Sequence, residues 1–337
     1  MPVTLKDVAK LASVSAQTVS NVVNGRRNVR SETRFRVLEA CEELNYTPNA
    51  VARSLVTRKS FTIGLVVTNI RNPIYGEIVD ITAEVAERYG YSVIVGNTKR
   101  DSASELRIVN LLLSQRVDGV LLASGAWDST ATELLQSSGI PVVRIHYHPK
   151  KLNTDYFGVD NCEGTRLATA HLISLGQKKI GFVNGPYSSI SIQREQGYRD
   201  AMSVADLPVN KDWMVDGGFT REQAYKTSKI ILANNSRPTA FVCASDLMAI
   251  GIMDAASDLS LNVPDDLALV GFDDMFLASI RAIALTTIRF DMTGLAEMAL
   301  LRLLNKMSDE GVKDQIKYQT ISPELIIRRS SGSKPDC

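Results

Sequence analysis

Two helix starts lie within residues 3–25, which read Val-Thr-Leu-Lys-Asp-Val-Ala-Lys-Leu-Ala-Ser-Val-Ser-Ala-Gln-Thr-Val-Ser-Asn-Val-Val-Asn-Gly. Thr4 is followed three residues later by the carboxylate of Asp7, which is the capping-box pattern of a helix N-terminus. Ser15 can cap a second helix over residues 16–24 in the same way. The stretch therefore predicts two short helices joined by a tight break.

A third helix is predicted from Ser31 onward. Its apolar residues recur at helical spacing and are expected on one face: Val37, Leu38, Cys41 and Leu44. Two helices separated by a few residues and followed by a third are typical of a helix-turn-helix module. The first 46 residues are therefore predicted to form a small all-α head.

The second helix has two different faces. Three valines at i, i+3 and i+4 should pack on the first helix: Val19, Val22 and Val23. The opposite face presents short side chains that could reach base edges in a major groove: Ala16, Gln17, Ser20 and Asn21. Arginines that could neutralise phosphates follow: Arg26, Arg27, Arg30, Arg34 and Arg36.

Charge is distributed unevenly along the chain. Residues 1–60 carry a net charge of +5, whereas residues 61–337 carry −4. A basic head on a slightly acidic body favours contact with a polyanion. The alternative is a pair of charged helices that is only solvated.

The head resembles that of the lactose-repressor (LacI/GalR) family of bacterial transcriptional regulators. The residues that carry the resemblance are 3–9, 14–20, 22–25 and 44–55, and the similarity continues to about residue 330. The resemblance implies DNA contacts by Thr4, Ser15, Ala16, Gln17, Thr18, Ser20, Asn21, Asn24, Arg34, Asn49, Ala52 and Leu55. Asn21 stands where many relatives carry arginine, so the family's common base preference need not hold at that position.

Residues 47–60 are expected to form a linker with one short helix over 49–57. Pro48 suits the first turn of a helix, but a helix of this length is marginal alone in water. The resemblance implies that it folds on operator DNA, where Leu55 would wedge between base pairs of the minor groove. The alternative is a plain linker with Leu55 packed against the body.

Residues 61–330 alternate strand-like and helix-like segments, which predicts α/β architecture with parallel sheets. The pattern restarts after about residue 160, so two lobes with a cleft between them are expected. The predicted fold is a helix-turn-helix head, the linker and a two-lobed body that resembles periplasmic binding proteins. Residues 331–337 would form a short tail.

Ligands of parallel α/β sheets bind beyond the carboxyl ends of the strands. The loops there contain polar and aromatic residues that suit a polyhydroxylated molecule. The family resemblance implies effector-binding roles for Arg194, which begins an Arg-x-x-Gly-Tyr pattern, and for Asp273. Five further cleft residues are proposed as ligands, with loop capping or packing as the alternative: Tyr75, Ser124, Phe219, Ser245 and Phe290.

Several classes of protein are disfavoured. No apolar run reaches the roughly 18 residues of a membrane span, and the N-terminus lacks the pattern of a signal peptide. The four cysteines are dispersed, which fits a reducing cytoplasm. We find no phosphate-binding glycine motif or nucleophile motif, and His146 with His148 form too weak a set for a metal. No cofactor, metal site or enzymatic activity is therefore expected.

The sequence thus predicts a sequence-specific DNA-binding regulator of transcription, in particular a repressor. It would bind near-palindromic double-stranded operator DNA as a homodimer and respond to a small-molecule effector, a sugar or sugar derivative. A soluble sugar-binding protein without a regulatory role and an α/β enzyme are the alternatives. The sequence leaves open whether the effector releases DNA or promotes its binding.

Overall fold

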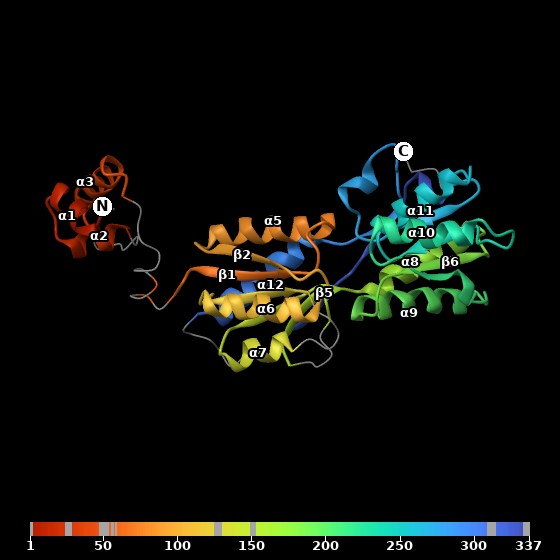
Figure 1. Ribbon diagram of the computed structural model, residues 1–337, viewed down its shortest axis with the longest axis horizontal. Coiled ribbons are helices and arrows are strands. Elements are labelled where there is room, and N and C mark those ends of the chain that lie inside the picture. Colours follow the sequence, from red (N-terminus) through yellow and green to blue (C-terminus); the bar gives the residue numbers. More distant parts are fainter. Residues whose placement is uncertain are drawn as a thin grey trace. The chain divides into compact units, whose positions relative to one another are not determined.

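The computed structural model describes residues 3–23, 29–46, 54, 57, 59–124, 130–148, 153–308 and 315–332. The chain divides into two compact units, Met1–Ser60 and Phe61–Cys337 (Figure 1). The smaller unit is called the head below and the larger one the body. Each is described separately.

Within residues 3–23 and 29–46 of the head the chain forms three helices, α1 (Leu5–Leu11), α2 (Ala16–Val23) and α3 (Ser31–Glu43). The two predicted caps are confirmed. The backbone N–H and the hydroxyl of Thr4 donate to the Asp7 carboxylate at 2.8 and 2.7 Å, and the Ser15 hydroxyl accepts from the Thr18 N–H at 3.1 Å. These local bonds set where α1 and α2 begin.

Small apolar side chains form the core of the head: Val8, Ala9, Ala12, Val19, Val22, Val37 and Ala40. The inward positions of Val19 and Val22 confirm the predicted face of α2. The prediction for Leu38 was wrong, because this side chain is 47% exposed. Leu38 is one residue beyond the buried Val37, and one helical step of about 100° turns it away from the core.

The first lobe of the body is a six-stranded parallel sheet in the order β11-β5-β4-β3-β1-β2. The strands are β1 (Thr62–Val67), β2 (Ser92–Asn97), β3 (Gly119–Ala123), β4 (Val142–Ile145), β5 (Asp155–Val159) and β11 (Tyr318–Ile321). Helices cover both faces: α5 (Pro73–Arg88) with α12 (Met292–Lys306), and α6 (Ser102–Ser114) with α7 (Ala131–Ser137).

The second lobe is a four-stranded parallel sheet in the order β7-β6-β8-β9. Its strands are β6 (Ile180–Asn184), β7 (Met214–Asp216), β8 (Ala240–Cys243) and β9 (Ala268–Val270). Its helices are α8 (Asn161–Ser174), α9 (Ser189–Val204), α10 (Arg221–Leu232) and α11 (Asp246–Asp258), which pack in the pairs α8–α9 and α10–α11.

The described residues of the body also form three short 3₁₀ helices and a two-stranded antiparallel ribbon. They are η1 (Lys211–Trp213), η2 (Phe276–Ser279), η3 (Arg329–Ser331), β10 (Thr287–Arg289) and β12 (Glu324–Ile326). The ribbon contacts α8 of the second lobe, whereas α12 and β11, which lie between its two strands in the sequence, belong to the first lobe. The chain therefore passes between the lobes after β5, after β10 and after β11.

Strands β5 and β11 were not predicted from the sequence. The side chain of Asp155 is fully buried at the start of β5, and aspartate is depleted in strands. Arg302 pairs with this carboxylate at 3.0 Å, Lys306 also pairs with it, and the Lys317 N–H donates to it at 2.7 Å. These contacts from α12 and the approach to β11 satisfy the buried charge, so a strand forms where the local sequence disfavours one.

No helix among the described residues is both long and apolar enough to cross a membrane.

Candidate functional site

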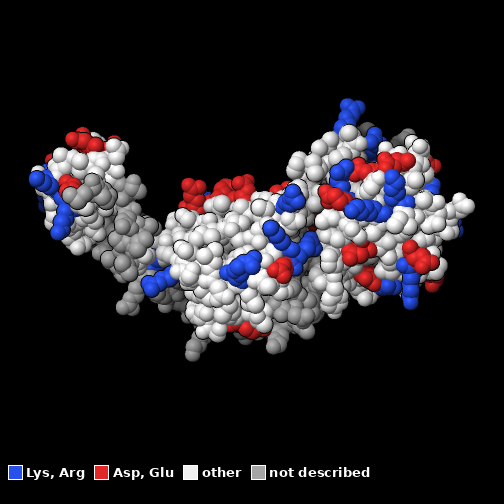
Figure 2. All heavy atoms as spheres, viewed as in Figure 1, with Lys and Arg blue, Asp and Glu red and all other residues white. Residues whose placement is uncertain are grey.

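The outer face of α2 is the candidate DNA-contacting surface. Ala16 and Gln17 are exposed, and the Gln17 amide donates to the side-chain oxygen of Asn21 at 3.2 Å. This bond joins two groups that can each donate and accept at base edges. Figure 2 shows Lys and Arg side chains gathered on one side of the head.

The other predicted DNA-contacting residues fall into three groups. Thr4, Ser15 and Thr18 use their hydroxyls in hydrogen bonds at the starts of α1 and α2. Ser20 and Arg34 are partly exposed on α2 and α3. The remaining four predicted positions lie outside the described residues: Asn24, Asn49, Ala52 and Leu55.

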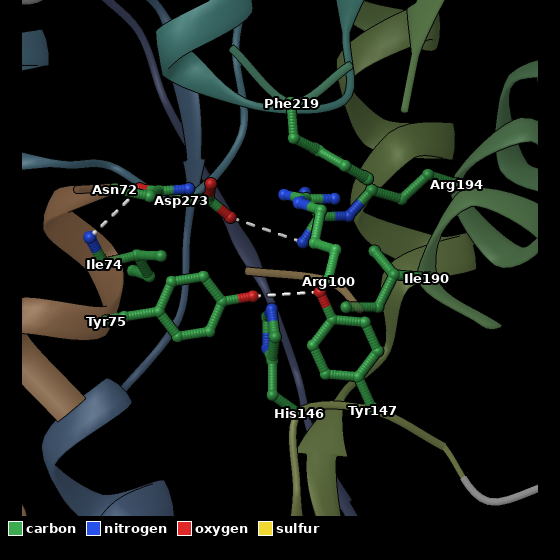
Figure 3. A pocket seen from close by; sticks show the side chains of 10 residues that line it. All are labelled: Asn72, Ile74, Tyr75, Arg100, His146, Tyr147, Ile190, Arg194, Phe219 and Asp273. Atoms are coloured by element: carbon green, nitrogen blue, oxygen red, sulfur yellow. Dashed lines mark hydrogen bonds and ion pairs between the residues drawn. The ribbon is translucent and has the colours of Figure 1, made fainter. Parts of the chain in front are cut away.

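A cavity lies between the two lobes of the body (Figure 3). The first lobe contributes the start of α5 and the loops after β2 and β4, and the second contributes α9 and the loops after β7 and β9. The lining residues are Asn72, Ile74, Tyr75, Arg100, His146, Tyr147, Ile190, Arg194, Phe219 and Asp273. The cavity measures about 20 Å³, which is room for one water molecule. A larger ligand therefore requires the lobes or these side chains to move.

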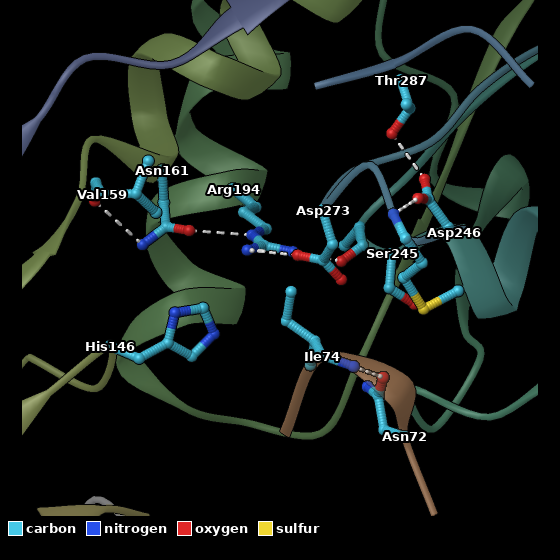
Figure 4. A network of polar contacts seen from close by, with 12 residues as sticks. Asn72, Ile74, His146, Val159, Asn161, Arg194, Ser245, Asp246, Asp273 and Thr287 are labelled. Carbon is cyan, nitrogen blue, oxygen red and sulfur yellow. Dashed lines mark hydrogen bonds and ion pairs between the residues drawn. The ribbon is translucent and has the colours of Figure 1, made fainter. Parts of the chain in front are cut away.

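Arg194 on α9 is the most highly connected side chain of the cavity. It is 1% exposed, donates to the Asn161 side chain at 2.9 Å and to the carbonyl of Ala244, and pairs with Asp273 at 3.3 Å (Figure 4). Its guanidinium carbon lies 3.5 Å from the centroid of the Phe272 ring. These contacts engage all three nitrogens of the guanidinium with groups of the second lobe and place the Asp273 carboxylate beside the cavity.

Four of the lining residues have left-handed backbone angles: φ is 65° at Arg100, 71° at His146, 51° at Phe219 and 107° at Asp273. Such angles cost free energy for residues other than glycine, and they cluster where surrounding structure imposes them for function. Each of the four follows a strand, so the strained turns aim these side chains into the space between the lobes.

The Asp273 carboxyl group has a raised pKa of about 6, because burial penalises its charged form more than Arg194 stabilises it. Burial and the nearby Arg194 charge lower the pKa of His146 to about 3. At neutral pH the cavity therefore contains a neutral imidazole beside an arginine–aspartate pair.

The cavity brings together Arg194, Asp273, Tyr75 and Phe219 of the predicted effector ligands. The other three predicted residues do not line it. Ser124 donates to Glu105 at 2.6 Å, Ser245 caps α11 by accepting from the Met248 N–H at 3.4 Å, and Phe290 stacks on the His146 ring at a centroid distance of 6.2 Å.

Arg100 and His146 are cavity residues that sequence reasoning missed as ligands. From the sequence, His146 was weighed only with His148 as a weak metal-binding pair. Arg100 lies in the loop after β2, for which the sequence suggested no role. Its position just beyond the carboxyl end of a strand is the signal that could have identified it.

Replacing His146 with phenylalanine should make the body more resistant to acid. Between pH 6.5 and 3 the unfolded chain binds a proton that folded His146 does not, so this residue costs stability as pH falls. Asp273 has the opposite effect on stability. Its folded pKa is raised, so between pH 6 and 4 the folded state binds a proton more readily than the unfolded chain, and this residue adds stability as pH falls. The free energy of unfolding should therefore fall less in His146→Phe than in wild type, by up to about 2–3 kcal/mol between pH 6.5 and 4.5.

Denaturant unfolding at several pH values measures this difference. Ile190→Val alters the same cavity without changing a titratable group and serves as the control. Equal pH dependence in wild type and His146→Phe would show that folded His146 accepts a proton as readily as the unfolded chain does.

Both units of the chain match families of known proteins. A family model described as bacterial regulatory proteins, lacI family, matches residues 4–49, and one described as a periplasmic binding protein-like domain matches residues 169–331. The HTH-type transcriptional repressor PurR of Haemophilus influenzae (strain PittEE) is 38% identical over 334 residues, covering 98% of this chain and 99% of the relative. PurR of Pasteurella multocida (strain Pm70) is 35% identical over 333 residues, with the same coverage.

Solved structures agree with these matches. The lac repressor dimer bound to operator and the anti-inducer ONPF has a TM-score of 0.86 and 29% identity, covering 98% of this chain and 99% of that chain. The complex of the transcriptional regulator CelR with cellobiose has a TM-score of 0.74 and 28% identity, covering 97% of this chain and 99% of that chain.

A helix-turn-helix head and a two-lobed body of the periplasmic-binding-protein type define a bacterial regulator of transcription. The chain belongs to the lacI family of bacterial regulatory proteins. It is a DNA-binding transcriptional repressor and not an enzyme, because the relatives that match almost its whole length are transcriptional repressors. The family and fold class predicted from the sequence are confirmed.

Proposed function

We propose that this repressor binds a near-palindromic operator as a homodimer and that a carbohydrate bound between the lobes controls its operator affinity. Residues 1–46 would read DNA, 47–60 would link the head to the body, and 61–330 would bind the effector and dimerise. The cytoplasm is the compartment in which such a protein meets its operator. The Arg194–Asp273 pair beside the interlobe cavity carries the effector part of the proposal.

The chemistry of the cavity supports a polar ring compound as the effector. A guanidinium donates and a carboxylate accepts, so Arg194 and Asp273 together can hold neighbouring hydroxyls of a sugar. Tyr75, Tyr147 and Phe219 provide apolar faces around this pair. The solved complex of CelR is with cellobiose, which supports a carbohydrate in a body of this type.

Lobe movement supplies a physical link between effector and operator. The lobes are joined by three crossings of the chain, and such crossings permit hinge closure or opening. Linkage requires that the effector change operator affinity by the same factor by which operator changes effector affinity.

A direct test uses full-length protein and an operator obtained by selection from random duplexes. Sugars and nucleobases are screened by thermal shift, in which a ligand at 100 times its Kd adds about 2.7 kcal/mol of stability. Positive compounds are then titrated against operator binding by fluorescence anisotropy, and sedimentation gives the oligomeric state. If a nucleobase changes operator affinity and sugars do not, the effector is a planar ring stacked on Tyr75 or Phe219 and not a carbohydrate. A panel in which no compound changes stability or operator affinity would reject effector control.

Gln17→Ala should weaken binding to the selected operator by about 1–3 kcal/mol and affect random DNA much less. Gln17 lies exposed on α2, and its loss removes a group that can bond a base edge and leaves Asn21 without this partner. Arg34→Ala should instead weaken both DNAs to a similar extent, because a phosphate contact is independent of sequence. Equal losses for Gln17→Ala on both DNAs would show that Gln17 does not read bases.

A further inference from the structure

The interlobe cavity contains more positive than negative charge. Its charged lining residues are Arg100, Arg194 and Asp273, and the only ion pair among these described residues joins Arg194 to Asp273. Arg100 makes no ion pair with a carboxylate in the described part of the chain. The guanidinium of Arg100 therefore lines the cavity without a counter-ion from any residue that the structure describes.

The position of Arg100 is defined by both lobes. Its guanidinium carbon lies 4.7 Å from the ring centroid of Phe219, which belongs to the opposite lobe. The neighbouring carboxylate of Asp101 does not serve as its counter-ion, because it caps α6 by accepting from the Ser104 N–H at 2.7 Å. Figure 3 shows Arg100 and Arg194 reaching the same part of the cavity.

His146, which lines the same cavity, carries a polar atom without a hydrogen-bond partner among the described residues. The His146 side chain is 4% exposed, and its Nδ1 atom has no hydrogen-bond partner among the described residues. The ring stacks on Phe290 and meets the rings of Tyr75 and Tyr147 edge-on, which fixes its plane. Buried polar atoms are normally hydrogen-bonded, so Nδ1 lacks a partner that a ligand could supply once these side chains move.

The carboxylates near the cavity are concentrated at its Asp273 end. Glu77 is half-buried and, through its charge, contributes to the raised pKa of Asp273. Asp274 is paired with Arg289 at 2.6 Å and with Arg328 at 2.7 Å. The positive charges at that end are paired with these carboxylates, so a negative group on a ligand would be attracted more strongly to Arg100, which is unpaired among the described residues.

We infer that the effector carries an anionic group, a phosphate or a carboxylate, that binds between Arg100 and Nδ1 of His146. The polar ring of the same molecule would be held by Arg194 and Asp273. This inference rests on the proposed function, because it specifies the chemical class of the effector at the proposed site. It makes Arg100 a residue that determines specificity for charged over neutral ligands.

The test compares ligands that differ only in charge, using full-length protein. Glucose, glucose 6-phosphate and glucuronate form one series, ribose and ribose 5-phosphate another, and adenosine and AMP a third. Inorganic phosphate is included, with sodium chloride at matched ionic strength as its reference. Comparison of the phosphorylated compounds with glucuronate shows whether the site binds a phosphate or a carboxylate.

We expect an anionic member to bind at least about tenfold tighter than its neutral counterpart, since a charge-assisted hydrogen bond contributes on this scale. Arg100→Gln should remove most of this preference, and Arg100→Lys should retain part of it because the charge remains. The control Arg107→Gln removes an exposed arginine that lies on α6 and donates to Ser104. It should leave the preference unchanged.

His146→Gln provides a second variant that keeps a hydrogen-bonding side chain at the other proposed contact, and it should reduce anion affinity without abolishing it. The inference is overturned if no anionic compound, phosphate included, exceeds its matched reference, or if the preference for anions is the same in Arg100→Gln. A neutral ligand that regulates operator binding and depends on Asp273 would then leave the proposed function standing. Absence of any effect by neutral and anionic compounds alike would reject both proposals.

Discussion

Val19→Asp should abolish specific operator binding, by about a thousandfold or more, while the body remains folded. Val19 is fully buried between the helices of the head, and an unpaired carboxylate there costs several kcal/mol. A unit of this size has only a small stability margin, so a loss of this size unfolds it. The body is a separate compact unit with its own core.

Operator binding by fluorescence anisotropy and thermal unfolding of the full-length protein measure the two parts of this prediction. Leu38→Asp places the same charge on the head at a position that is 47% exposed, so it should keep the head folded and lose at most about tenfold in DNA affinity. The prediction fails if Val19→Asp binds operator as well as Leu38→Asp does. Loss of the body's unfolding transition would instead show that the two units depend on one another.

Asp273→Asn should lower effector affinity tenfold or more and remove the effector's influence on operator binding. The variant keeps the size of the side chain but replaces a charged acceptor with a neutral one, and a charge-assisted hydrogen bond is worth about 1.5–3 kcal/mol. Asparagine can still accept from Arg194, so the buried guanidinium keeps a partner.

The structure makes Asn preferable to Ala at this position. Asp273→Ala would leave Arg194 buried without a counter-ion, and breaking a buried pair in this way costs about 3–5 kcal/mol. Arg194→Ala has a related defect, since it strips a partner from both Asn161 and Asp273. Either alanine variant would confound ligand binding with folding.

Calorimetric titration of the identified effector, paired with operator binding, tests Asp273→Asn. Asp254→Asn is the matched control, because Asp254 pairs with Arg221 at the surface at 2.6 Å and such pairs contribute about 1 kcal/mol or less. If Asp273→Asn binds the effector with wild-type affinity, the effector-binding site lies in another part of the body.

Interactions between residues that are close together in the sequence could be predicted from the sequence alone. The bonds of Thr4 to Asp7 and of Ser15 to Thr18 span three residues each, so residue type and spacing suffice to predict where α1 and α2 begin. The valine spacing of α2 likewise predicts its buried face. The same reasoning misassigned Leu38, because burial on the outer part of α3 depends on which neighbours the helix meets.

The candidate site was only partly predictable for the same reason. Arg194 and Asp273 follow strands and match the pattern of a family, so the sequence singled them out. Ser124 and Ser245 also lie where strands end, but Glu105 and the start of α11 engage them. Nothing in the local sequence around Arg100 predicts that it meets Phe219, a residue of the other lobe.

The helices of the head and the α/β class could thus be predicted from residue type and spacing, because capping and amphipathic periodicity act over three or four positions. The family was identified from the resemblance of the motifs in the head. The strand pair β5–β11 and the closed interlobe cavity were not accessible in this way. Asp155 pairs with Arg302 and accepts from Lys317 across about 150 residues of chain, and Arg100, His146 and Asp273 meet only when two lobes pack together. Burial and long-range ion pairing are properties of the packed chain, so only the tertiary structure shows which strands pair and which charges share the cavity.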